Sequence, residues 1–251
     1  MLPYDEAGTG DALVLLHAGI ADRSMWSAQL EPLAAAGYRV IAPDLPGFGE
    51  SPEGPGPLAP WQDVLGLLDQ LGIPEAVLVG DSFGAATALR VAVVAPERVR
   101  ALALISALAE EIEASDRLRA VWAAEEEAVE RGDIDGAVQA VLDGWTLPDA
   151  PPELREHVAA MQRRALELQL AAGEVEQAPD PLDADPDWPA RLRMPILLAA
   201  GERDMPDCQE AVHVYHGRLP HARAEFIPGA GHLAPLETPD AFRELLLDFL
   251  G

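Results

Sequence analysis

Short, continuous apolar runs recur along the chain and alternate with longer segments of helical periodicity. A strand with one solvated face alternates apolar and polar residues, whereas an uninterrupted apolar run is typical of a strand that is buried on both faces. Each run tends to end at Gly, Pro or Asp, the usual residues of a turn from strand to helix. The pattern predicts a parallel sheet covered by helices on both faces. The runs occupy residues 12–17, 39–44, 76–80, 101–106, 195–201 and 224–229, with helices expected at 26–36, 60–71, 83–95, 207–218 and 239–250.

One long region interrupts this alternation. Residues 108–189 contain no strand-like run, only acidic, alanine-rich helical stretches such as 117–131 and 152–173, followed by the segment APDPLDADPDWP. We expect a core formed by residues 1–107 and 190–251, with residues 108–189 inserted as a helical cap at the carboxyl edge of the sheet, where α/β proteins bind ligands. The alternative is a helical excursion that only packs on the sheet.

Composition narrows the classes of partner. With 251 residues, 49% of them apolar, the chain is long enough to bury one substantial core. Its formal net charge of -26 opposes binding to nucleic acid and anionic membranes. No apolar stretch approaches the roughly 20 residues of a membrane span, and no signal peptide is recognisable at the start. We therefore expect a cytoplasmic protein that acts on a small molecule.

The basic residues and the single cysteine limit which cofactors the chain is expected to bind. All 17 basic residues are arginine, so a Walker A phosphate loop, which needs lysine, is absent. This usage fits either a high-GC genome or adaptation to high salt. Cys208 is the single cysteine and has no Cys or His at ligand spacing, so it is interpreted as a small apolar filler. No metal and no cofactor is expected.

The pentapeptide Gly-Asp-Ser-Phe-Gly follows the run that ends at residue 80 and precedes a helical segment. Such a strand–Gly-x-Ser-x-Gly–helix arrangement is a nucleophile elbow, in which a strained turn lifts a serine hydroxyl clear of the sheet. Gly80 and Gly84 remove Cβ atoms that would clash in the turn, and the helix dipole favours developing negative charge. Ser82 is thus the candidate nucleophile, and the alternative is a helix cap.

A serine nucleophile needs a histidine base that is oriented by a carboxylate. His232 lies in a glycine-rich loop after the last predicted strand, and Asp204 follows the preceding strand, so both are expected at the edge where Ser82 emerges. Asp207, which suits a helix cap, and Glu202 are the alternative acids. The predicted catalytic residues are Ser82, Asp204 and His232.

The other histidines are assigned different places. His213 and His216 would share one face of a helix and are interpreted as surface residues, as are His157 and His221. None of them has the partners that would make a metal site.

The chain resembles the α/β-hydrolase superfamily along nearly its whole length, through LVLLHAG, DLPGFGES, LVGDSFG, GERD and GAGH. The resemblance implies an α/β-hydrolase fold with a mostly parallel, twisted sheet of about seven strands, because only the end of the usual N-terminal hairpin is present. In HAGIADRSMW it implies an oxyanion hole formed by the N–H groups of Gly19 and Phe83. Ala18 replaces the usual glycine, which leaves Ile20 as an alternative donor, and His17 is expected to shape the loop.

The resemblance also limits the reaction. Haloalkane dehalogenases and epoxide hydrolases of this fold have aspartate at the centre of the elbow, whereas this chain has Ser82, and Asp81 should point elsewhere. We expect a serine hydrolase of the esterase and lactonase branch. The alternatives are a carbon–carbon bond hydrolase or perhydrolase with the same triad, and a hydrolase-fold receptor with little turnover.

Specificity is expected to come from large apolar residues beside the oxyanion loop and in the cap, since such side chains offer contact area to an apolar substrate. The alternative for each of them is packing of the cap onto the core. The candidate substrate-binding residues are Ile20, Trp122, Trp145, Met161 and Trp188.

Overall fold

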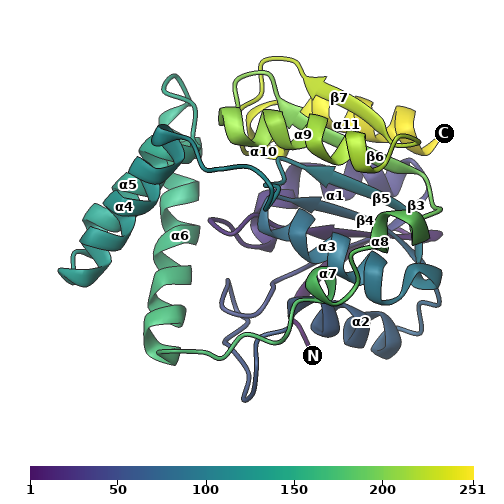
Figure 1. Cartoon of the computed structure of the whole chain (residues 1–251), viewed down its shortest axis with the longest axis horizontal. Helices are drawn as coiled ribbons and strands as arrows, with labels where there is room; N and C mark the ends of the chain where they lie inside the picture. Colours follow the sequence, from purple (N-terminus) through teal and green to yellow (C-terminus); the bar gives the residue numbers. More distant parts are fainter.

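The strands form one seven-stranded sheet in the computed structural model, which describes residues 1–251 (Figure 1). The strand order is β1-β3-β2-β4-β5-β6-β7, and only β1 is antiparallel to its neighbour. The predicted sheet of about seven mostly parallel strands is confirmed. The strands are β1 Tyr4–Ala7, β2 Asp11–Leu16, β3 Tyr38–Pro43, β4 Ala76–Asp81, β5 Val99–Ile105, β6 Ile196–Gly201 and β7 Arg223–Ile227.

Both faces of the sheet are buried, as the continuous apolar runs predict. Successive side chains of a strand point to opposite faces, so each central strand supplies two apolar layers. On β4, Leu78 joins the cluster under α2, α3 and α9, while Val77 and Val79 join the cluster under α1 and α11. These helices are α1 Ser27–Ala35, α2 Pro60–Gln70, α3 Phe83–Val94, α9 Pro206–Arg218 and α11 Pro239–Leu250.

Three helices form the insertion between β5 and β6 and stand beside the sheet core in Figure 1. The expected helices at 117–131 and 152–173 are present, with an additional helix between them. Ser115 caps the first by accepting a hydrogen bond from the Leu118 N–H, and Asp133 caps the second. The insertion helices are α4 Asp116–Glu130, α5 Ile134–Trp145 and α6 Pro152–Ala172.

The return segment contains two short helices, α7 Pro181–Ala184 and α8 Trp188–Arg191. Asp180 caps α7 and pairs with Arg90 of α3, and α7 packs against α3. The segment therefore contacts the core rather than the insertion helices alone. The exact division at residues 108 and 189 stays a prediction.

The remaining short helices lie near the ends of the strands: η1 Arg23–Trp26, η2 Pro96–Arg98 and α10 Ala234–Glu237. Because β2, β4, β6 and β7 run parallel, their carboxyl ends meet at one edge of the sheet. The loops that follow these strands carry the predicted catalytic residues and the predicted oxyanion donors.

Candidate active site

Ser82 has the backbone conformation of a strained elbow. Its φ of 52° and ψ of -110° lie outside the regions that L-residues favour. The Ser82 N–H donates to the Ile105 carbonyl at 2.8 Å, which ties the elbow to β5. The Ser82 side chain makes no capping bond to α3. The hydroxyl therefore does not cap the helix, which was the alternative role for Ser82.

The two flanking glycines are required by close backbone contacts. A Cβ on Gly80 would lie 2.2 Å from the Gly84 carbonyl oxygen, and one on Gly84 would lie 2.1 Å from the Leu16 carbonyl oxygen. No side chain can occupy either position without moving the backbone. The spacing of the pentapeptide thus follows from the packing of β4, α3 and the end of β2.

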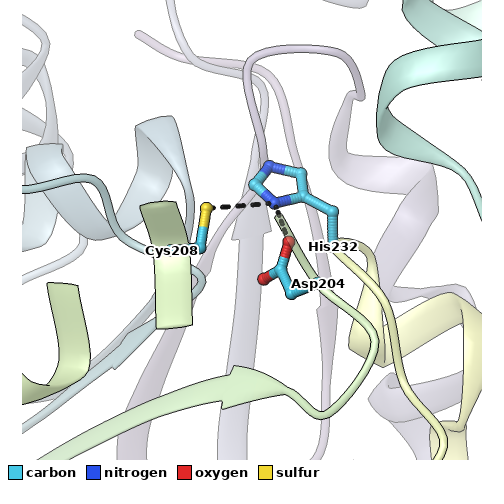
Figure 2. Close-up of side chains that lie close together, drawn as sticks. All are labelled: Asp204, Cys208 and His232. Atoms are coloured by element: carbon cyan, nitrogen blue, oxygen red, sulfur yellow. Dashed lines mark hydrogen bonds and ion pairs between the residues drawn. The ribbon is translucent and has the colours of Figure 1, made fainter. Parts of the chain in front are cut away.

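His232 and Asp204 meet at the same edge of the sheet. His232 Nδ1 lies 3.0 Å from Asp204 Oδ1, and both residues are buried (Figure 2). Burial disfavours the imidazolium, but the charge of Asp204 and this hydrogen bond outweigh it and raise the pKa of His232 well above 6.5. The second ring nitrogen points away from Asp204, and no hydrogen bond joins it to Ser82 in this structure.

The two alternative acids have other partners. The Asp207 carboxylate accepts hydrogen bonds from the Ser115 N–H at 2.7 Å and from its hydroxyl at 2.6 Å, so it anchors the start of α4. The expectation that Asp207 caps α9 is wrong, because Met205 occupies the cap position. Glu202 accepts from the Gly229 N–H at 3.1 Å. Of the three candidate acids, only Asp204 forms a hydrogen bond with His232.

The predicted oxyanion donors lie against one another. A Cβ on Gly19 would come within 3.2 Å of the Phe83 Cβ. The Phe83 N–H is the first of α3 and has no acceptor within the helix, and the Gly19 N–H donates to no backbone carbonyl. Ile20, the alternative donor, is half-buried and packs beside the apolar cluster that includes Trp145.

His17 is a structural residue of this loop. Its Nδ1 lies 2.8 Å from the Ala18 carbonyl oxygen, and its Nε2 accepts from the Leu45 N–H at 2.9 Å. Both nitrogens are occupied, and burial lowers the pKa of His17. These two contacts fit the expectation that His17 shapes the loop, and the lowered pKa favours its neutral form.

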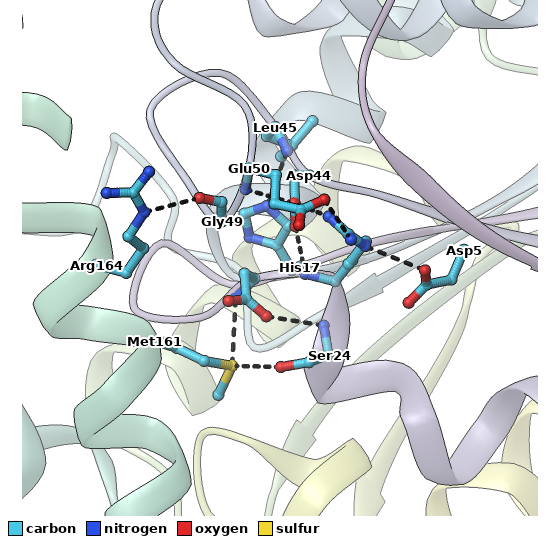
Figure 3. A network of polar contacts seen from close by, with 11 residues as sticks. Asp5, His17, Ser24, Asp44, Leu45, Gly49, Glu50, Met161 and Arg164 are labelled. Carbon is cyan, nitrogen blue, oxygen red and sulfur yellow. Dashed lines mark hydrogen bonds and ion pairs between the residues drawn. The ribbon is translucent and has the colours of Figure 1, made fainter.

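A polar network braces the outer side of the same loop (Figure 3). The buried Asp44 carboxylate accepts from the N–H groups of Arg23 and Glu50, each at 2.8 Å, and pairs with the Arg23 guanidinium. Met161 of α6 reaches this network through its sulfur, 3.4 Å from the Asp22 nitrogen. These contacts join the oxyanion loop to the loop after β3 and to the insertion.

The five predicted substrate-binding residues lie in different environments. Trp145 is buried, with its ring centroid 4.3 Å from that of His232. Trp122 is exposed and, with Leu118, lines a hollow between α4 and the start of α9. Met161 is buried against the polar network described above, and Ile20 lies beside the Trp145 cluster.

Trp188 is separated from this group. It is 2% exposed in the core cluster on the α2–α3 side of the sheet, and the guanidinium carbon of Arg218 lies 4.5 Å from its ring centroid. This is the environment of a packing residue, the alternative to substrate binding for this side chain. The role of the other four in binding stays a prediction.

Three residues at the site were not identified from sequence. The Cys208 sulfur lies 3.7 Å from His232 Nδ1, and Asp204, Cys208 and His232 form a group with the geometry to hold a metal ion. Asp81 is fully buried without a hydrogen-bond partner for either carboxylate oxygen. Glu237 accepts from the Gly231 N–H at 2.7 Å. No spacing in the sequence signals these contacts.

Residues 11–239 match the protein family described as the alpha/beta hydrolase fold. The chain therefore belongs to the α/β-hydrolase family, as its sheet order and its Ser82 elbow indicate. None of its helices has the length and apolar character needed to cross a bilayer.

Individual relatives cover several hydrolase chemistries. A 113-residue segment is 42% identical to a 2-hydroxy-6-oxo-6-phenylhexa-2,4-dienoate hydrolase from Comamonas testosteroni and covers 42% of this chain and 39% of that protein. The structure of a thermophilic esterase from Thermogutta terrifontis superposes with a TM-score of 0.82 at 29% identity, covering 99% of this chain and 92% of the other. That of an enol-lactonase from Burkholderia xenovorans superposes with a TM-score of 0.77 at 25% identity, covering 99% and 96%.

Proposed function

We propose that this protein is a serine hydrolase that cleaves a small to medium carboxylic ester or lactone through an acyl-enzyme intermediate. The observation that supports the proposal most is the strained elbow at Ser82. The Ser82 hydroxyl makes no capping hydrogen bond and lies at the same sheet edge as the hydrogen-bonded pair Asp204 and His232. The similarity to an esterase and an enol-lactonase supports this substrate class.

Each residue has one role in the proposed reaction. Ser82 Oγ attacks the substrate carbonyl carbon while His232 Nε2 takes the hydroxyl proton, and Asp204 stabilises the imidazolium that forms. Catalytic hydrogen bonds are often long in a free enzyme and tighten with substrate bound, so Nε2 and Oγ are expected to approach during the reaction.

The oxyanion of the tetrahedral intermediate is stabilised by the N–H groups of Gly19 and Phe83, each worth roughly 10²- to 10³-fold in rate. His232 then protonates the leaving alkoxide, which leaves an acyl ester on Ser82. A water molecule, deprotonated by His232, attacks that ester and releases the acid together with the free serine. No cofactor takes part in these steps.

A second candidate is the hydrolysis of a carbon–carbon bond in a vinylogous diketone by the same residues. The identity of 42% to a dienoate hydrolase over 113 residues favours it. Epoxide opening in this superfamily uses an aspartate at the elbow centre, and the presence of Ser82 at that position disfavours this reaction.

A panel of p-nitrophenyl esters of graded acyl length, lactones and diketones tests both candidates. We expect Ser82→Ala to lower kcat/KM for the best ester by at least about 10³-fold, since removing a serine nucleophile leaves only residual stabilisation. Ser106→Ala is the matched control, because Ser106 is another strand-end serine with positive φ whose buried hydroxyl has no partner. Turnover of esters by Ser82→Ala at the wild-type rate would show that the proposed mechanism is wrong.

A further inference from the structure

Cys208 lies beside the predicted catalytic pair, although the proposed reaction does not need it. It is in the first turn of α9, four residues after Asp204, so the turn between β6 and α9 brings both side chains to His232. All three are at least 95% buried. Figure 2 shows the sulfur and the carboxylate converging on the same ring nitrogen, Nδ1.

The donor atoms have the spacing of ligands around one small cation. In a tetrahedral zinc site, with Zn–S of about 2.3 Å and Zn–N or Zn–O of about 2.0–2.1 Å, sulfur and nitrogen stand roughly 3.5 Å apart and nitrogen and oxygen roughly 3.3 Å. Here the corresponding distances are 3.7 Å and 3.0 Å, and all three donor atoms lie within 4.8 Å of one another. The cation would draw the sulfur and the carboxylate closer together than this 4.8 Å limit, to the spacing of a tetrahedral site.

A second observation also indicates a missing partner at this place. Asp204 Oδ2 is buried and has no hydrogen-bond partner, although Oδ1 bonds both His232 and the Met205 N–H. A buried carboxylate oxygen normally has a partner, because leaving it without one costs roughly 1–3 kcal/mol. A cation bound by Cys208 and His232 would supply this partner once the Asp204 carboxylate turns Oδ2, in place of Oδ1, toward Nδ1.

We propose that Asp204, Cys208 and His232 form an inhibitory site for a borderline-soft divalent cation such as Zn²⁺. A thiolate, an imidazole nitrogen and a carboxylate are the donor types that zinc takes, and the fourth position is left to water. The net charge of -26 raises the concentration of cations near the surface and favours their entry.

Occupation of the site would block the proposed reaction by a tautomer change. When His232 is neutral and metal-free, its one ring proton lies on Nδ1 and is donated to Asp204, so Nε2 carries the lone pair that accepts the Ser82 proton. A cation that binds Nδ1 displaces the proton from that nitrogen, and the neutral ring then carries its proton on Nε2. His232 can no longer act as the base, and the Cys208 thiol releases its proton to solvent. The inhibition rests on the proposed function, whereas the binding does not.

Binding is tested by titrating the chelator-treated full chain with Co²⁺, a spectroscopic probe for zinc sites, and displacing it with Zn²⁺. We expect one equivalent of Co²⁺ and a near-ultraviolet sulfur-to-cobalt charge-transfer band in the wild type. Cys208→Ala should lose the band and bind Zn²⁺ at least about tenfold more weakly. Absence of the band in the wild type, or an unchanged Zn²⁺ affinity in Cys208→Ala, would overturn the proposal.

The control variant addresses the surface histidines. His213 and His216 are exposed on α9 and could hold Zn²⁺ adventitiously. The double variant His213→Ala/His216→Ala should keep both the one equivalent of bound Co²⁺ and the sulfur-to-cobalt band, whereas bound Co²⁺ that shows no such band and is lost in the double variant would belong to the surface pair and overturn the proposal. Because the band needs no turnover, a chain that binds Co²⁺ but hydrolyses no ester refutes the proposed function and leaves the metal site standing.

Inhibition is then measured as the ester-hydrolysis rate with Zn²⁺ divided by the metal-free rate of the same variant. We expect Zn²⁺ to reduce the wild-type rate reversibly, with recovery on adding chelator, and Cys208→Ala to need at least about tenfold more Zn²⁺. Equal sensitivity of the two proteins would refute inhibition through this site.

Discussion

At the scale of single residues, Asp81 is an acidic side chain that lies fully buried. It ends β4 on the face where Val77 and Val79 pack, and neither of its carboxylate oxygens has a partner. Burial raises the pKa of Asp81 well above its usual value, and the charges of Asp204 and Glu237 add to this while His232 opposes it. The neutral acid is therefore the favoured form in the folded protein.

Replacing Asp81 with asparagine should change how stability depends on pH. In the unfolded chain this carboxyl has a pKa of about 3.9, and in the folded protein its pKa is higher. The wild type therefore loses stability as pH rises from the unfolded-state pKa to the folded-state pKa. The side-chain amide of asparagine does not titrate. We expect Asp81→Asn to gain stability relative to the wild type as pH rises above the unfolded-state pKa of about 3.9, by up to about 1.4 kcal/mol per pH unit until the folded-state pKa is passed, measured by denaturant unfolding.

Asp183→Asn removes a carboxylate from an exposed position on α7 and is the matched control, measured over the same pH range. Parallel curves for Asp81→Asn and the wild type would contradict an acid held neutral by burial.

At the scale of elements, the short helix α10 connects the His232 loop to the insertion. Its last residue, Glu237, is largely buried and accepts from the Gly231 N–H at 2.7 Å and from the Leu147 N–H at 3.2 Å. Gly231 precedes His232, and Leu147 follows Trp145, whose ring lies on the imidazole. One carboxylate thus holds both the residue before the predicted base and the segment that carries Trp145. We infer that Glu237 is a positioning residue.

Glu237→Gln should impair this arrangement because an amide has one acceptor oxygen where the carboxylate has two. We expect a loss of about 1–3 kcal/mol in unfolding free energy and a lower kcat with a smaller change in KM. Glu244→Gln removes the same charge from an exposed position on α11 and should leave both quantities near the wild-type values. A wild-type kcat in Glu237→Gln would show that Glu237 does not position His232.

At the scale of the whole molecule, parallel strands explain why distant residues meet. Ser82, Asp204 and His232 follow three different strands whose carboxyl ends share one edge. The continuous apolar runs were therefore enough to predict the six strands β2 to β7, and the glycine spacing and the chain order predicted the elbow and the pairing of Asp204 with His232. The strand β1 was expected only from the family resemblance.

Contacts that depend on side-chain direction could not be predicted in the same way. Asp204 and Asp207 both follow β6, and only the turn decides that one faces His232 and the other Ser115. Cys208 was interpreted as filler because its neighbour His232 is 24 residues away and arrives through β7. Trp188 resembles a cap residue in sequence, but the return segment packs it on the core.

Covalent labelling tests the central claim most directly, namely that Ser82 is a nucleophile activated by His232. Folded protein is treated with a fluorophosphonate and the modified peptide is identified by mass spectrometry. The account predicts one phosphonyl group per chain on Ser82, none in Ser82→Ala and much slower labelling in His232→Ala. Labelling of a different residue, or of Ser82 at the same rate without His232, would contradict it.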